Sequence, residues 1–274
     1  MKFTLLTPVY LIALYGLVAF ARRRKAGAEK FGWTPLESVA VTLFIFFAGQ
    51  IIGGFIAYLF ASFGGGSQQE VLDWLSDATI GQFLFIVLNA SVSIGLLMFF
   101  LKQRATSIKR LGYERGPHWS DIAYALIALV VYFVAYIVLV SIIKQLVPSL
   151  DVGQEQQIGF ESITKSQLPL VFISLVVIPP LLEETLTRGF LYTGLKKGTN
   201  RYLAVIITSV IFAVAHLQFG SGAPLLWIAA IDTFTLSLFL IYLKEKTGSL
   251  WASILLHALK NFIAFTALFI FNAK

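Results

Sequence analysis

The 274 residues of the chain are 58% hydrophobic and only 13% charged, and the mean hydropathy is +0.82. A soluble domain of this length could not hide so much apolar surface from water, so we predict an all-α integral membrane protein. The sequence contains no cysteine, which excludes disulfides, thiol nucleophiles and thiolate metal ligands. The net charge of +7 lies in short clusters between apolar runs, which indicates membrane orientation and no nucleic-acid partner.

The apolar residues form eight runs that are long enough to cross a hydrocarbon core of about 30 Å, which takes ~20 helical residues. They lie at about 3–21, 37–63, 81–101, 121–143, 168–195, 202–219, 224–243 and 250–271. These runs lack the period-two alternation of membrane strands and are too long for them. The sequence therefore predicts a polytopic bundle of about eight transmembrane helices, with membrane lipids as its surroundings.

The connecting loops alternate in charge along the chain. Loops 22–36, 102–120, 196–201 and 244–249 hold fifteen lysine and arginine residues, whereas the opposite loops and the two termini hold four. Positively charged loops stay in the cytoplasm, so we expect the first set of loops inside and both termini outside.

Ionisable residues inside the last four runs are the most informative feature of the sequence. A charge at bilayer depth costs a few kcal/mol even on mild scales, so such residues face a protein interior or a water-filled cavity. These residues are Glu183, Glu184, Arg188, His216, Asp232, His257 and Lys260, with Asn261 beside them. Counting from the basic loops at 1.5 Å per residue places Glu183, His216, Asp232, His257 and Asn261 roughly 16–22 Å from one face of the membrane. Four helices thus bring polar groups to one depth, which we call the polar layer.

The spacing of these residues predicts how they work together. Glu184 and Arg188 lie four residues apart and can form an ion pair. A carboxylate and an imidazole on neighbouring helices can activate a water molecule. His257 and Asn261 share a helix face and can donate hydrogen bonds to a developing oxyanion. These side chains together indicate a hydrolytic site in which water, and no covalent nucleophile of the protein, attacks the substrate.

Three short motifs resemble those of the CAAX-protease and bacteriocin-processing (Abi) family of intramembrane endopeptidases, which includes the type II CAAX prenyl endopeptidases. The first is Glu183-Glu184 followed by Arg188, the second is Phe212 followed by His216, and the third is His257 followed by Asn261. The turn at 247–251 is also similar to the one that commonly precedes the third motif. The resemblance covers about residues 168–265.

The resemblance implies a role for each matching residue. Glu183 is expected to be the general base, with His216 helping to hold and polarise the water. His257 and Asn261 are expected to form the oxyanion hole, and Glu184 and Arg188 to be a supporting pair. The resemblance also implies a core at 151–274 behind variable helices at 1–150, all in one membrane domain.

Three further residues are candidates for substrate binding. Phe212 shares a helix face with His216, and it is also expected to pack beneath the site. Asp232 and Lys260 depart from the family pattern, since small or apolar residues are usual there. Both lie in the polar layer, so we expect either a structural ion pair or a contact with substrate.

The resulting interpretation is an intramembrane peptidase that cleaves a hydrophobic or lipidated peptide or protein, such as a prenylated CAAX-type C-terminus or a small membrane peptide. The plasma membrane of a prokaryote is the expected location. Two alternatives remain open: a proton-coupled transporter, since buried Glu, His, Asp and Lys suit a proton relay, and a non-catalytic scaffold. We expect no cofactor. Zinc held by two histidines and two glutamates is a less favoured variant, because the HExxH signature is missing.

Overall fold

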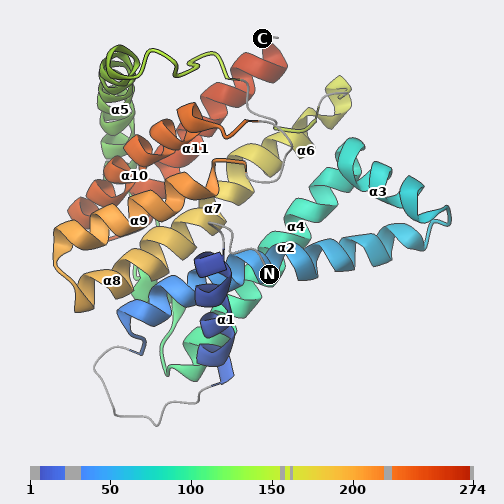
Figure 1. Ribbon diagram of the computed structural model, residues 1–274, viewed down its shortest axis with the longest axis horizontal. Coiled ribbons are helices and arrows are strands. Elements are labelled where there is room, and N and C mark those ends of the chain that lie inside the picture. Colours follow the sequence, from blue (N-terminus) through green and yellow to red (C-terminus); the bar gives the residue numbers. More distant parts are fainter. Residues whose placement is uncertain (1–6, 22–31, 155–157, 161–162, 219–223, 272–274) are drawn as a thin grey trace.

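The computed structural model describes residues 7–21, 32–154, 158–160, 163–218 and 224–271, and these form helices and connecting loops without a strand. Figure 1 shows α1 and α4 packed against α2 on one side of the molecule, and α5, α10 and α11 packed together on the other. The N-terminal half contains α1 (Thr7–Ala21), α2 (Pro35–Ser62), α3 (Gln68–Asp77), α4 (Thr79–Gln103) and α5 (Trp119–Leu146). The C-terminal half contains α6 (Leu168–Phe172), α7 (Ile178–Glu184), α8 (Thr193–Gly198), α9 (Arg201–Ala215), α10 (Trp227–Thr247) and α11 (Trp251–Phe265).

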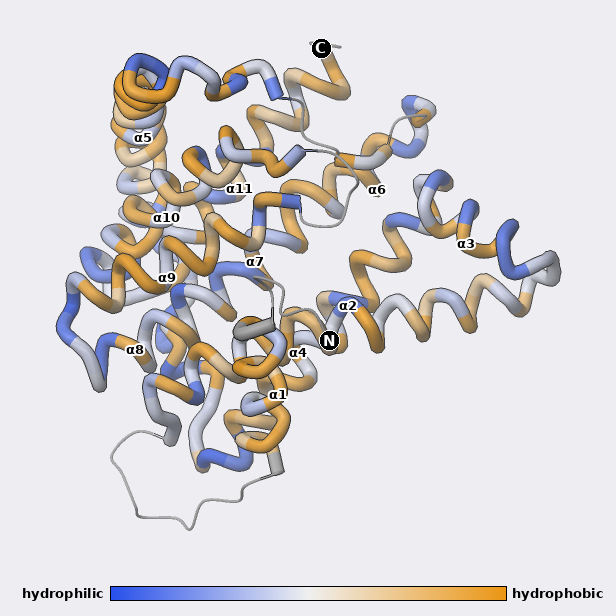
Figure 2. The backbone as a smooth tube through the Cα atoms, viewed as in Figure 1, coloured by the Kyte–Doolittle hydropathy of each residue, from blue (hydrophilic) through white to orange (hydrophobic). Residues whose placement is uncertain are grey.

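Each of the eight apolar runs contains a helix, although the run 202–219 leaves its helix at His216 and the run 224–243 enters its helix at Trp227, and this confirms the polytopic helical fold. Six helical segments are long and apolar enough to cross a membrane: Pro35–Ser62, Thr79–Gln103, Trp119–Leu146, Lys165–Gly198, Trp227–Thr247 and Trp251–Ile270. The other two runs give shorter apolar helices, Val9–Phe20 and Arg201–Ala215. Figure 2 shows hydrophobic residues along α2, α4 and α5, with hydrophilic residues gathered in α3 and between α8 and α9.

The segment 168–198 is one membrane passage interrupted by two wider, π-helical turns. The first turn, Ile173–Val177, comes immediately before Pro179 and Pro180, and the second covers Thr185–Tyr192. Proline has no backbone N–H and clashes with the carbonyl four residues earlier, so a regular helix cannot continue through this pair. The two wide turns flank α7, which ends on the two glutamates of the first motif.

Helices α2 and α4 pack closely through glycine. A Cβ atom added to Gly49 would lie 2.1 Å from Ser93 Oγ, and one added to Gly53 would lie 2.7 Å from Asn89 Cα. Only glycine, which has no Cβ atom, allows the two backbones to approach so closely at these positions. Gly95, four residues after Ser91 on α4, makes no such contact, since nothing lies within 4 Å of its added Cβ.

One helix was missed by the sequence analysis, which took residues 64–80 as a loop. Ser67 caps α3 by accepting the Glu70 N–H, while the Glu70 side chain accepts the Ser67 N–H. This reciprocal capping box was visible in the sequence. The helix is too short and polar to cross a membrane, and its leucine and tryptophan side chains alternate with acidic groups.

The loops that alternate in charge separate into two faces of the bundle. On the face that we call the basic face, the Leu250 N–H donates to the Gly112 carbonyl at 3.1 Å, and Lys196 Nζ pairs with Glu245 at 2.6 Å. On the opposite face, the Phe160 N–H donates to Gln82 Oε1 at 2.9 Å. The loop 22–36, also expected on the basic face, is described only from residue 32.

Candidate active site

Glu183, at the end of α7, stands between the two motif histidines. Its Oε2 atom lies 3.9 Å from His216 Nε2 and 4.0 Å from His257 Nε2, and it has no hydrogen-bond partner among the described residues. These distances are too long for direct hydrogen bonds. The Glu183 side chain is 31% exposed, so one part of the carboxyl group is accessible and the other points into the site.

Glu184 is fully buried and has a different set of contacts. Its Oε1 atom accepts hydrogen bonds from Arg188 at 3.0 Å and from His257 Nδ1 at 2.9 Å. The Arg188 side chain is 0% exposed and its guanidinium carbon lies 4.1 Å above the centre of the Phe212 ring. The expected ion pair between Glu184 and Arg188 is therefore confirmed. A buried charge needs such a partner, and the pair in turn fixes the orientation of His257.

His216 caps the C-terminus of α9, where the predicted helix would have continued to residue 219. Its Nδ1 atom lies 2.8 Å from the Phe212 carbonyl, and because a carbonyl only accepts, Nδ1 must carry the proton. The Nε2 atom of the ring then faces Glu183. Phe212 is 2% exposed and its ring contacts both histidines, with centroid distances of 4.8 Å to His216 and 6.0 Å to His257. Phe212 therefore packs beneath the site.

Asn261 bridges α11 to the interrupted helix. Its side-chain Nδ2 donates to the Leu175 carbonyl at 2.9 Å. In a regular helix this carbonyl would accept the N–H of residue 179, which is proline and has none. One N–H of the amide thus satisfies the group that Pro179 leaves unpaired, and the second N–H remains available for another acceptor.

Lys260 and Asp232 form the expected ion pair, with 2.5 Å between Lys260 Nζ and Asp232 Oδ2. The Tyr132 hydroxyl donates to the other carboxylate oxygen of Asp232. The sequence did not indicate Tyr132, since a tyrosine in an apolar run looks like packing. The three residues come from α5, α10 and α11, and they extend the polar layer sideways from His257.

Lys244 also contributes to the site, although its sequence position suggested only a basic residue at a helix end. Its Nζ donates to the Arg188 carbonyl and to Thr193 Oγ1. Both acceptors belong to the wide turn at Thr185–Tyr192 and its junction with α8. The lysine therefore holds the backbone that carries the Arg188–Glu184 pair.

No group of three or more His, Asp or Glu side chains in the described part of the chain has the arrangement of a metal-ion site. The two glutamates and two histidines named for zinc lie near one another, but Glu184 Oε1 and both Nδ1 atoms are already engaged in hydrogen bonds. Glu183, the Oε2 atom of Glu184 and the two Nε2 atoms are the donors that remain.

Comparison with known proteins agrees with the motifs. Residues 165–263 match the family model of type II CAAX prenyl endopeptidases that are Rce1-like. The protein YdiL of Bacillus subtilis (strain 168), whose name describes a candidate membrane peptidase, is 31% identical over 94 residues. This alignment covers 34% of the chain and 35% of YdiL, so it spans about a third of that relative. The resemblance to CAAX-type membrane proteases is thereby confirmed for the segment that holds all the motif residues.

A second relative is similar over nearly the whole chain. It is an uncharacterized protein of Mycoplasma capricolum subsp. capricolum (strain California kid), 25% identical over 264 residues, which are 93% of this chain and 72% of the relative. No solved structure matches the chain significantly.

Proposed function

We propose that the chain is an intramembrane peptidase in which Glu183 activates a water molecule for attack on a peptide bond. The single observation that supports this most is the position of the Glu183 Oε2 atom, about equally far from the Nε2 atoms of His216 and His257. A water molecule between these three atoms could bond to the carboxylate and to an imidazole at normal distances. Glu183 then takes the proton as water attacks the carbonyl carbon.

The two histidines would have different tasks, because their Nδ1 partners differ. His216 bonds to a neutral carbonyl, whereas His257 bonds to the carboxylate of Glu184. The carboxylate of Glu184 also fixes the ring of His257, which places its Nε2 atom toward Glu183. We therefore assign His257 to the oxyanion of the tetrahedral intermediate and His216 to the attacking water, as the family resemblance implies.

Asn261 would assist through the N–H that Leu175 does not use. Because its other N–H is bonded to the backbone, the amide is held in one orientation. Fixed donors stabilise a developing charge better than mobile ones. The role assigned to Asn261 by the family resemblance is thus compatible with its second task in the fold.

The wider assignment follows from the same site. The substrate class is a hydrophobic or lipidated peptide, since only such a chain would enter a site at membrane depth. The catalytic core is 151–274, with the helices of 1–150 packed around it, and the proposed mechanism uses no cofactor. The proposed location is the plasma membrane of a prokaryote.

Cleavage by the purified protein tests this function. The full chain in detergent is incubated with a library of quenched hydrophobic and prenylated peptides. We expect Glu183→Gln to lower kcat by about 10²–10⁴-fold, as for loss of a general base. Surface variant Glu114→Gln, in an exposed loop, is the matched control and should keep full activity. Cleavage that survives in Glu183→Gln would refute the site, and substrate-dependent proton flux in liposomes without cleavage would favour the transporter.

A further inference from the structure

The polar layer is closed toward the basic face of the bundle. Gly189 follows Arg188, and a Cβ added to it would lie 3.2 Å from both Leu111 and Leu250. Tyr113 of the same loop bonds Thr185 Oγ1 at 2.7 Å. The loop that carries Leu111 and the turn that carries Leu250 therefore pack directly against the helix of the first motif.

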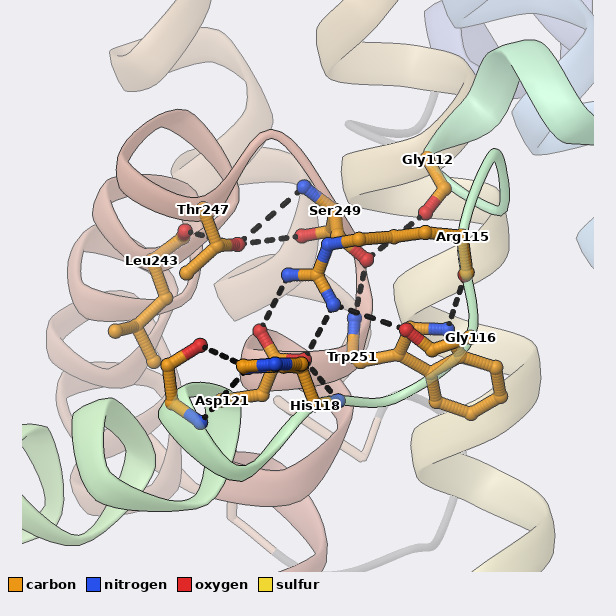
Figure 3. A network of polar contacts seen from close by, with 10 residues as sticks. Gly112, Arg115, Gly116, His118, Asp121, Leu243, Thr247, Ser249 and Trp251 are labelled. Atoms are coloured by element: carbon orange, nitrogen blue, oxygen red, sulfur yellow. Dashed lines mark hydrogen bonds and ion pairs between the residues drawn. The ribbon is translucent and has the colours of Figure 1, made fainter.

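This closure is reinforced by hydrogen bonds between the two segments. Ser249 Oγ and the Leu250 N–H both donate to the Gly112 carbonyl, and Trp251 Nε1 donates to the Arg115 carbonyl at 2.8 Å. Figure 3 shows the contact of Ser249 with Gly112 and that of Trp251 with Arg115. Side chains beneath them are fully buried, including Glu184, Arg188, Phe190, Leu191 and Leu250.

Accessible atoms of the layer must therefore be reached from another direction. The side chains of Glu183, His216 and Lys260 are 31%, 22% and 22% exposed. A charged side chain that faced lipid near the bilayer centre would cost roughly 2.5–3.5 kcal/mol or more. The exposed parts of these groups are thus expected to face water.

The length of α9 shows where that water enters. The helix has 15 residues, and at 1.5 Å each it rises only ~22 Å from Arg201 before it ends at His216. The chain then turns, and the Leu226 N–H bonds the Leu217 carbonyl before α10 begins. Non-helical backbone at membrane depth is tolerated only inside protein or beside a water-filled cavity. Beyond His216, on the face opposite the basic loops, the hydrocarbon thickness of about 30 Å is not filled by α9.

The final helix is uncovered next to Asn261. The basic-face half of α11 is buried at Ala252, Ser253 and Leu256, whereas Phe262 and Ile263, just beyond Asn261, are exposed. One turn after Asn261, Phe265 is buried in a cluster with Phe160, Val171 and Val176, so the uncovered stretch of α11 is local to the site.

We propose that the catalytic layer opens to the face opposite the basic loops, and that its substrates are membrane-anchored peptide segments presented on that face. Since basic loops are retained in the cytoplasm, this face is the extracytoplasmic one. The substrate class rests on the proposed peptidase function, whereas the direction of opening does not. A C-terminus that remains in the cytoplasm would meet the closed side.

The absence of native cysteine makes the test direct, because each single-cysteine variant carries one thiol. Reporter thiols are Glu183→Cys and Lys260→Cys, the latter combined with Asp232→Asn so that no unpaired carboxylate remains. Face controls are Glu114→Cys in the exposed loop of the basic face and Asp73→Cys on the exposed side of α3. A membrane-impermeant cationic methanethiosulfonate is applied to sealed vesicles, either right-side-out or inverted, and labelling is read by mass.

We expect both reporters to be labelled when the reagent is on the side that labels Asp73→Cys. We expect neither reporter to be labelled when the reagent is on the side that labels Glu114→Cys. Asp73→Cys should react in right-side-out vesicles. Labelling of the reporters from the Glu114→Cys side, from both sides equally, or only after denaturation would overturn the proposed opening. Reaction of Glu114→Cys in right-side-out vesicles would overturn the extracytoplasmic assignment. Because labelling needs no catalysis, a wild-type chain that cleaves no peptide, together with correctly labelled reporters, would refute the peptidase and leave the opening intact.

Discussion

Asn261 donates a hydrogen bond to the Leu175 carbonyl, the group that lacks its helical partner because residue 179 is proline. This contact links the third motif to the break that precedes the first motif. It lets α7 start at a bend and still carry Glu183 and Glu184 toward the histidines. The position of Glu183 and Glu184 beside the histidines therefore depends on the structural hydrogen bond between Asn261 and Leu175.

The link between Asn261 and Leu175 predicts a conditional loss of stability. Asn261→Ala leaves the half-buried Leu175 carbonyl unpaired and should destabilise the protein by about 1 kcal/mol. In a Pro179→Ala background the new N–H can bond Leu175 itself, so the same substitution should cost less. Thermal unfolding in detergent of the four proteins in this cycle measures the coupling. Equal costs in both backgrounds would show that Asn261 does not compensate for the proline.

The two adjacent glutamates should respond differently to the same chemical change. Glu184→Gln removes the partner of a fully buried arginine, and breaking such a pair costs about 3–5 kcal/mol. Glu183→Gln removes no hydrogen bond to a described residue, so its unfolding temperature should stay near that of the wild type while cleavage is lost. Unfolding and peptide cleavage are measured on the same preparations. The opposite pattern would exchange the roles of the two residues.

The pair of Lys260 and Asp232 should be coupled more strongly than its partial exposure suggests. Lys260→Met leaves Asp232 with only the Tyr132 hydroxyl, and Asp232→Asn leaves the ammonium unpaired. The double variant removes both charges and should be more stable than either single variant, because a buried pair is often replaceable by neutral groups. Chemical denaturation of the four proteins gives the interaction energy. A double variant that is as unstable as the sum of the singles would rule out direct coupling.

Gly49 and Gly95 should respond in opposite directions to the same substitution. Gly49→Ala places a methyl group against Ser93 and should destabilise the bundle by about 1–3 kcal/mol through overpacking. Gly95→Ala, which meets nothing within 4 Å, should instead stabilise its helix by roughly 0.5–1 kcal/mol. The comparison of melting temperatures checks both signs. Similar effects of the two substitutions would contradict the close approach of α2 and α4.

Chelation separates the metal-free route from the zinc variant. With Glu183 as the base and no metal in the mechanism, cleavage should be unchanged after prolonged treatment with 1,10-phenanthroline. The non-chelating 1,7-isomer is the matched control for effects on the detergent. Loss of activity that zinc restores would instead assign Glu183 and the two Nε2 atoms as ligands.

The sequence alone determined the class of fold and the membership of the polar layer. Long apolar runs without period-two alternation can only be helices in a membrane, and charges within them must meet partners or water, so Glu183, Glu184, Arg188, His216, Asp232, His257 and Lys260 could be grouped before any coordinates. The pairs Glu184–Arg188 and Asp232–Lys260 were also predictable, the first from spacing within one helix and the second from shared depth.

Only the tertiary structure decided which partner each group takes and where the site is accessible. Depth along a helix does not give rotation about its axis, so nothing in the sequence indicated that Asn261 bonds Leu175, that Tyr132 bonds Asp232, or that Lys244 holds the Arg188 carbonyl. The capping box of α3 was readable but was overlooked among apolar runs. The closed and open sides of the layer depend on contacts between segments far apart in the chain, such as Gly112 with Leu250, which local patterns do not encode.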